Sequence, residues 1–168
     1  RIKADNRLEA DGTLRGTFTL TAEGQSDSNI RRIFTTGFQS EWKSTMERQL
    51  LAISPKARLL SVDYGKNPKD YQAAPIKITF RYEIPDYALK GEGEMFFRPM
   101  VMNNLYNQVR SYMWIDTSVE NRKYGFKDAC SRLVELDETV QLPAGYKLVS
   151  AVKDETMQGV GADFEGSL

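Results

Sequence analysis

Apolar and polar side chains alternate along much of the first hundred residues, which is the pattern of β-strands with one buried face. The alternating runs are residues 2–10, 14–22, 60–64 and 76–84. In the third run, Leu60, Val62 and Tyr64 share the apolar face. Asp11-Gly12, between the first two runs, is typical of the turn that closes a hairpin. Gly16 lies among apolar positions, where we expect another backbone to approach closely.

Between Asp27 and Ile53 the apolar residues recur every three or four positions, which predicts an amphipathic helix. The residues of its apolar stripe are Phe38, Trp42, Met46, Leu50 and Ile53. The stripe drifts toward its N-terminal end, and Thr35-Thr36-Gly37 disfavours helix there, so a kink or a junction of two short helices is expected near Gly37. We expect the stripe to pack on a sheet face that includes Phe18, Leu20, Ile78 and Phe80.

The last third of the chain contains further strand patterns around residues 133–142 and 146–152, separated by the turn sequence Pro143-Ala144-Gly145. The predicted fold class is α+β and mainly β: an antiparallel sheet covered by one long amphipathic helix, with or without a kink, followed by β-sandwich-like strands. The predicted domains are residues 1–100 and 101–168, and we expect the second to be cut short at its C-terminal end.

Charge and hydropathy exclude several classes of partner. The 168 residues include 23 Lys+Arg and 23 Asp+Glu, a balance that argues against a nucleic-acid module. No apolar run is long enough to span a membrane. The chain begins Arg-Ile-Lys without a methionine, so we expect it to be a piece of a longer protein.

The sequence contains no histidine and one cysteine, Cys130. The usual zinc sites and the Ser-His and Cys-His catalytic pairs therefore lack essential groups, and we predict no catalytic residue, no metal site and no cofactor. Cys130 is expected to be a small packed side chain. Carboxylates in predicted loops and strands offer the ingredients of an acid–base pair or a calcium site, although such groups are usually just solvated. They are Asp63, Asp70, Asp86, Glu92 and Glu94.

One aromatic group is a candidate ligand platform. Tyr112, Trp114 and Tyr124 lie close in sequence, and exposed rings of this kind can stack on sugars. The alternative, which residue statistics favour, is that these rings pack in the core or pair across strands.

Several short motifs together resemble one family. They are Leu8-x-x-Asp11-Gly12-x-Leu14-x-Gly16, the arginines Arg31 and Arg32, the alternating run 76–82, Pro85-Asp86-Tyr87-Ala88, Arg122-Lys123-Tyr124 and Leu142-Pro143-Ala144-Gly145-Tyr146. The chain resembles the β-rich C-terminal region of bacterial secreted proteins with a transglutaminase-like, papain-like core. The resemblance implies a domain of unknown function that follows the catalytic core, whose Cys, His and Asp would lie upstream.

The expected function is therefore that of a non-catalytic accessory domain, with other domains of the same polypeptide as partners. The resemblance implies a periplasmic or cell-surface location. Two alternatives remain open at this point: a free-standing module that binds a glycan or peptide, and an enzyme that uses carboxylates alone.

Overall fold

The structure, a computed structural model, describes residues 1–102, 121, 123, 133–151, 153–159 and 163–167. Its strands are β1 (Ile2–Leu8), β2 (Leu14–Ala22), β3 (Arg58–Asp63), β4 (Ile76–Ile84), β5 (Leu89–Lys90), β6 (Met95–Phe96), β7 (Leu136–Gln141), β8 (Glu155–Gln158) and β9 (Asp163–Gly166). Its helices are α1 (Gly24–Thr36) and α2 (Trp42–Leu51), with 3₁₀ turns at Gln39–Glu41 and Met100–Met102.

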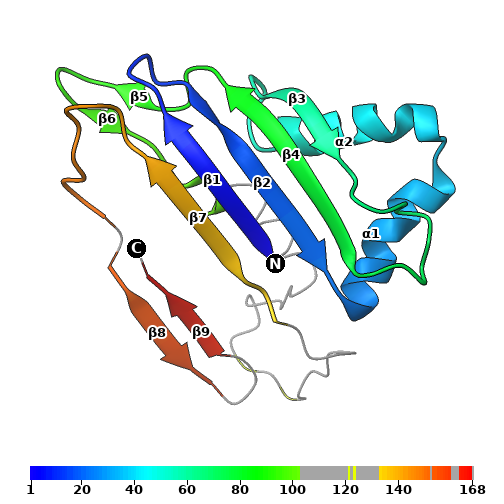
Figure 1. The fold of residues 1–168 in the computed structure, drawn as a ribbon. Helices are drawn as coiled ribbons and strands as arrows, with labels where there is room; N and C mark the ends of the chain where they lie inside the picture. Colours follow the sequence, from blue (N-terminus) through cyan, green and yellow to red (C-terminus); the bar gives the residue numbers. More distant parts are fainter. Residues whose placement is uncertain (103–120, 122, 124–132, 152, 160–162, 168) are drawn as a thin grey trace.

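Five strands form the main sheet in the order β3-β4-β2-β1-β7 (Figure 1). The first four pair antiparallel, as the alternating pattern predicts. The fifth, β7, runs parallel to β1, with Ile2 opposite Leu136 and Arg7 opposite Gln141. The sheet is therefore mixed, and the prediction of an antiparallel sheet is wrong. Alternation along a strand defines its two faces but carries no information about the direction of its neighbour.

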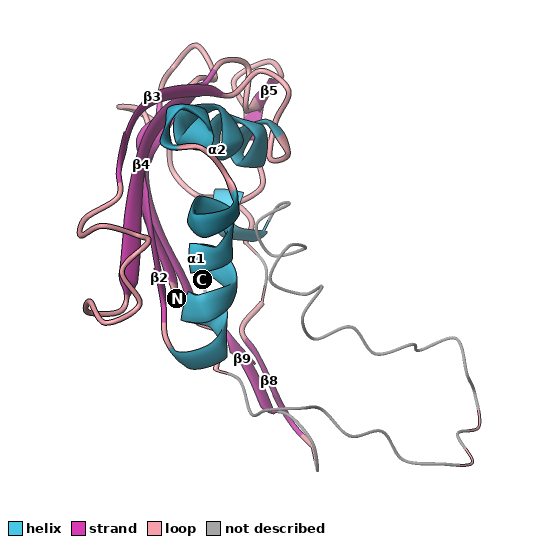
Figure 2. Cartoon of the chain, turned by 90° about the vertical axis from the view of Figure 1, so that its right-hand side faces the viewer, coloured by secondary structure: helices cyan, strands magenta, loops and turns pink. Residues whose placement is uncertain are grey.

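The prediction of one long helix is also wrong. Helix α1 ends at Thr36, and α2 starts at Trp42 after a 3₁₀ turn. Gly37 and Phe38 are extended, with ψ angles of 162° and 145°, and they redirect the chain where the sequence indicated a kink or a junction. Both helices lie on the same side of the main sheet (Figure 2).

The core lies between these helices and the sheet. Trp42, Met46 and Leu50 are buried, as the apolar stripe predicts. Phe38 is 76% exposed, so its predicted burial is wrong: it falls in the break between the helices, and the helical period does not apply to it. The opposing sheet face includes the buried Phe18 and Phe80, whose rings stack with centroids 4.3 Å apart.

Of the apolar face predicted for β3 and the residue after it, Val62 and Tyr64 pack against the core, and only the predicted burial of Leu60 is wrong. The register with β4 shifts between Leu59 and Ser61, which is the signature of a bulge. Leu59 and Val62 pack against the core, whereas Leu60 is 48% exposed on the other face. An extra residue in one strand shifts the alternation by one position, and the sequence alone gave no sign of it.

The second half of the chain does not form a sandwich of its own within the described residues. Strand β7 completes the main sheet, while β8 and β9 form a separate two-stranded hairpin. The β-sandwich part of the fold prediction is therefore wrong. The proposed division at residues 1–100 and 101–168 stays a prediction. No helix within the described residues is long and apolar enough to cross a membrane.

Candidate functional site

The candidate platform of Tyr112, Trp114 and Tyr124 lies outside the described residues, and so does Cys130. Their proposed roles stay predictions. We therefore look for a site among the side chains that the structure describes.

Of the loop carboxylates, Asp63, Asp70 and Asp86 accept hydrogen bonds, and Glu92 and Glu94 are exposed. The side chains of Asp63 and Asp70 accept backbone N–H bonds from Gly65 and Gln72, each at 2.9 Å. Asp86 pairs with Lys56 at 2.7 Å, and this hydrogen bond holds the pKa of the Asp86 carboxyl below its usual value. Within the described residues, no three His, Cys, Asp or Glu side chains gather as a metal site would require.

The solvent-facing side of the main sheet carries an ordered row of charges. Strand pairing places five residues side by side across the sheet, one from each strand. In spatial order they are Gln141, Arg7, Arg15, Glu83 and Arg58. Arg7 and Arg15 are directly opposite each other on β1 and β2. Like charges in this position repel, so the row is an unfavourable arrangement unless an anion compensates for it.

Existing carboxylates neutralise this row only in part. Glu83 is within 3.3 Å of both Arg15 and Arg58, so one carboxylate is shared by two guanidinium groups. Arg7 is 3.4 Å from Glu9, at the rim. The next row along the strands contains Arg81, for which no ion pair is found among the described residues. We call Arg7, Arg15 and Arg81 together the basic row; all three are exposed on the open face.

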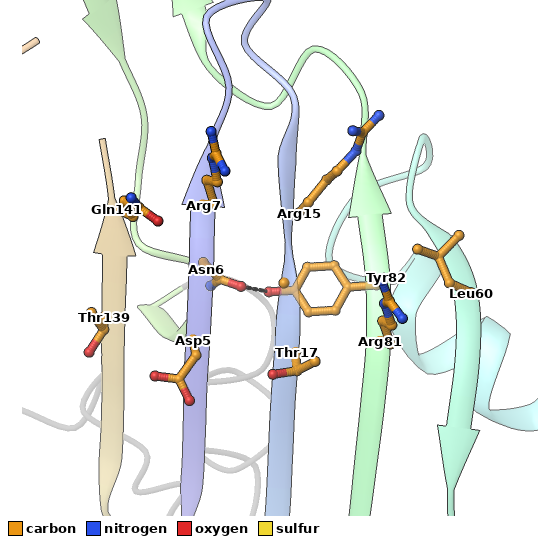
Figure 3. A pocket seen from close by; sticks show the side chains of 11 residues that line it. Asp5, Asn6, Arg7, Arg15, Thr17, Leu60, Arg81, Tyr82, Thr139 and Gln141 are labelled. Atoms are coloured by element: carbon orange, nitrogen blue, oxygen red, sulfur yellow. Dashed lines mark hydrogen bonds between the residues drawn. The ribbon is translucent and has the colours of Figure 1, made fainter. Parts of the chain in front are cut away.

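These arginines surround a shallow depression of about 440 Å³ that is open to solvent. Its lining also includes a carboxylate, hydroxyls and an apolar side chain, from Asp5, Thr17, Thr139 and Leu60. Figure 3 shows Arg7 and Arg15 extending from neighbouring strands, with Thr17 and Asp5 farther along the same two strands. The charged side chains of the depression are thus mostly cationic, and they come from strands of the main sheet.

Gly16 makes the floor of the depression, and the structure explains why no side chain is present there. A Cβ atom at this position would lie 2.0 Å from the Asn6 Oδ1 atom and 2.4 Å from the backbone oxygen of Asp5. The predicted close approach of another backbone at Gly16 is therefore confirmed. The Tyr82 side chain passes Gly16 to reach Asn6, as the dashed line in Figure 3 marks.

A buried polar chain runs beneath the basic row. The Tyr82 hydroxyl donates to Asn6 Oδ1, and Asn6 Nδ2 donates to Glu138 Oε1 at 2.7 Å. The second carboxylate oxygen of Glu138 accepts the backbone N–H of Val101 at 2.9 Å. Burial raises the pKa of Tyr82, and the nearby Glu138 charge raises it further, so the phenol stays protonated and donates. These hydrogen bonds link β4, β1, β7 and the turn at Met100–Met102.

A second buried polar cluster lies on the helical side. Arg31 is 2% exposed, and its guanidinium donates to Asp27 at 2.7 Å and to the carbonyls of Pro68 and Ala74. Asp27 also accepts the N–H of Ile76, the first residue of β4, at 2.7 Å. Burial alone would raise the Asp27 pKa, but the bonds from Arg31 and Ile76 outweigh it and hold the pKa below its usual value. This cluster fixes the loop between β3 and β4.

Comparison with protein-family models, curated proteins and solved structures gave no match to this chain. The site must therefore be interpreted from its own geometry.

Proposed function

We propose that this chain is a non-catalytic accessory domain of a larger secreted or periplasmic protein with a transglutaminase-like core. The observation that carries the proposal is the use made of the buried polar side chains. Glu138, Asn6 and Tyr82 fasten β7 to the sheet, and Asp27 with Arg31 fastens the loop before β4. Polar groups that hold chain segments together through hydrogen bonds are typical of a scaffold.

The two sides of the sheet support the same proposal. The helices cover one face (Figure 2), and the outward side chains of β1 and β4 on the other face are charged or carry hydroxyls. A domain with one free, polar sheet face can pack beside another domain, because interfaces between domains of one chain are commonly polar. The family resemblance supplies the candidate neighbour, a catalytic core that lies upstream in the same polypeptide.

The exposed groups also favour a supporting role over acyl transfer. Acyl transfer needs an activated nucleophile and a base with a pKa near neutrality. The depression is lined mainly by arginines, threonines and one carboxylate, Asp5. Arginine stays protonated at all ordinary pH values, so these guanidinium groups hold anions and do not accept protons.

An activity comparison tests the proposal. Residues 1–168 and their Cys130→Ser variant are assayed on amide, ester and glutamine–amine substrates. We expect no turnover with either. The parent polypeptide is then compared with a version that lacks these residues, and we expect the deletion to lower the activity or stability of the core. Turnover by the isolated chain that disappears in Cys130→Ser would overturn the proposal.

The proposal includes a location and a set of partners. The resemblance favours the periplasm or the cell surface, and the partners would be domains of the same polypeptide. The neutral charge balance argues against nucleic acid. Fractionation of the source cells, with the chain followed by an antibody, would test the location.

The second candidate function is a free-standing module that binds a peptide or glycan. The observation in its favour is the basic depression on the open sheet face, which offers charged and hydroxyl groups at fixed positions. One measurement distinguishes the two candidates, namely ligand binding by the isolated chain. A free-standing module binds its ligand when isolated, whether or not deleting residues 1–168 from a longer protein harms a catalytic core.

A further inference from the structure

We propose that the basic row of Arg7, Arg15 and Arg81 is a binding site for an extended acidic polypeptide segment, whose carboxylates the arginines hold. This inference does not depend on the accessory-domain proposal, since a domain of either kind can bind such a segment. It rests on the charge of the row, on the spacing of its arginines and on the chemistry of the depression that they surround.

The first support is unneutralised charge at a fixed place. Arg7 and Arg15 are cross-strand neighbours, and Arg15 shares the carboxylate of Glu83 with Arg58. The row across the sheet contains three arginines and has the carboxylates of Glu83 and Glu9 within ion-pair distance, which leaves one positive charge in excess. A carboxylate between Arg7 and Arg15 would turn a repulsive pair into an attractive triad. Guanidinium groups bind carboxylates through two parallel hydrogen bonds, which gives such a triad a defined geometry.

The second support is spacing. Arg15 and Thr17 lie two residues apart on β2, and Thr17 is directly opposite Arg81 on β4. The rows that contain Arg15 and Arg81 are therefore about 6.8 Å apart along the strands, which is twice the rise per residue of a β-strand. Alternate side chains of an extended peptide are separated by the same distance. Acidic residues at positions i and i+2 of such a peptide can reach both rows at once.

The lining of the depression favours a peptide over a sugar or a phosphate. Among the described residues that line the depression, Tyr82 is the only aromatic one, but it is fully buried and its hydroxyl donates a hydrogen bond to Asn6. The described part of the lining therefore offers a sugar ring no exposed aromatic face on which to stack. Asp5 sits in the same depression and repels a dianion such as phosphate more than a single carboxylate. Leu60, which is 48% exposed at the edge, offers an apolar contact to a peptide side chain.

The experiment measures binding of a fluorescent peptide of five Glu-Thr repeats to residues 1–168. We expect saturable binding that weakens as salt is raised, because the contacts are exposed charges. The Arg7→Gln/Arg15→Gln variant should bind at least about tenfold more weakly, as expected for the loss of charge-assisted bonds. Circular dichroism should show that this variant keeps its fold, because both side chains are exposed at the surface.

A matched control distinguishes peptide binding at the basic row from general electrostatic attraction to the protein. Arg32→Gln/Arg48→Gln removes the same charge from exposed positions on α1 and α2. This variant should bind the peptide as tightly as the original chain. Equal loss of binding in the two double variants, or no binding by the original chain, would overturn the proposal.

Competition identifies the ligand class. A scrambled peptide with its glutamates in one block keeps the charge and loses the alternate spacing, and we expect it to bind more weakly. Polygalacturonate and inorganic phosphate, at matched charge concentration, should displace the peptide poorly. Displacement by polygalacturonate at equal or lower concentration would replace the peptide site with an acidic-sugar site. Displacement by phosphate alone would reduce the row to a general anion site.

Discussion

The hydroxyl of Tyr82 on β4 donates its hydrogen bond to Asn6 on β1, past the intervening strand β2. This contact is possible because Gly16 stands between them on β2 without a side chain. A glycine within a strand usually weakens it. Here it opens the path for a polar chain that continues to Glu138 on the parallel edge strand β7.

Gly16→Ala should therefore destabilise the chain by about 1–3 kcal/mol or more, because overpacking forces neighbouring atoms to move. The added Cβ would meet the backbone of Asp5 at 2.4 Å, which cannot swing aside as a long side chain would. Urea unfolding would measure the loss. Gly91→Ala is the control, since its Cβ would have no neighbour closer than 4.0 Å. Equal stability of the two variants would contradict the close approach.

Tyr82→Phe removes the donated hydrogen and leaves the ring in place. The Asn6 Oδ1 atom then lacks its donor in a buried position, which we expect to cost about 1–3 kcal/mol. Tyr71→Phe, at a ring that is 53% exposed, should change the stability little. Thermal unfolding of both variants checks the difference, and an unchanged Tyr82→Phe variant would show that the hydroxyl contributes nothing to the stability.

Trp42→Ala and Phe38→Ala test the break between the helices. Trp42 is 7% exposed and meets the rings of Phe34 and Tyr64 edge to face, with centroids 5.1 and 5.4 Å away. Its truncation should cost about 3–5 kcal/mol. Phe38 is 76% exposed, so its truncation should cost less than about 0.5 kcal/mol. A continuous helix would instead make both losses large, which denaturant titration would reveal.

Much of the sheet could be predicted because the sequence patterns that indicate its strands and turn lie within short segments of the chain. The run from Ile76 to Ile84 alternates without a fault, and it forms β4 with the same bounds. The predicted hairpin at Asp11-Gly12 joins β1 and β2. In each case the side-chain pattern is set by burial of one face, which acts residue by residue and can be read from the sequence.

The parts that could not be predicted depend on contacts between distant residues. The pairing of β7 with β1 joins residues more than a hundred positions apart, and no local pattern indicates it. The basic row was missed for the same reason. The sequence pattern could assign each arginine of the basic row (Arg7, Arg15 and Arg81) to the solvent-facing side of a strand. Only the pairing register of the strands shows that they are neighbours. The Asn6–Glu138 bond gave no signal either, because a polar residue among apolar ones does not reveal its partner.

Asp27→Asn should show how the buried Arg31 is held. The substitution removes the carboxylate that pairs with Arg31, whose side chain is only 2% exposed. We expect this to lower the free energy of unfolding by about 3–5 kcal/mol at neutral pH. The Asp27 pKa is lowered in the folded chain, so the carboxylate stabilises the fold above its unfolded pKa of about 3.9. This contribution is lost as the pH falls through the folded value.

The stability gap between the original chain and Asp27→Asn should therefore be constant from about pH 7 to pH 5 and should narrow below about pH 4. Urea unfolding at a series of pH values measures the gap. The control is Asp137→Asn, at an exposed position on β7, for which we expect no gap at any pH. If the gap for Asp27→Asn stayed unchanged down to pH 2, or widened, the carboxylate would not be the charge that stabilises the buried guanidinium of Arg31.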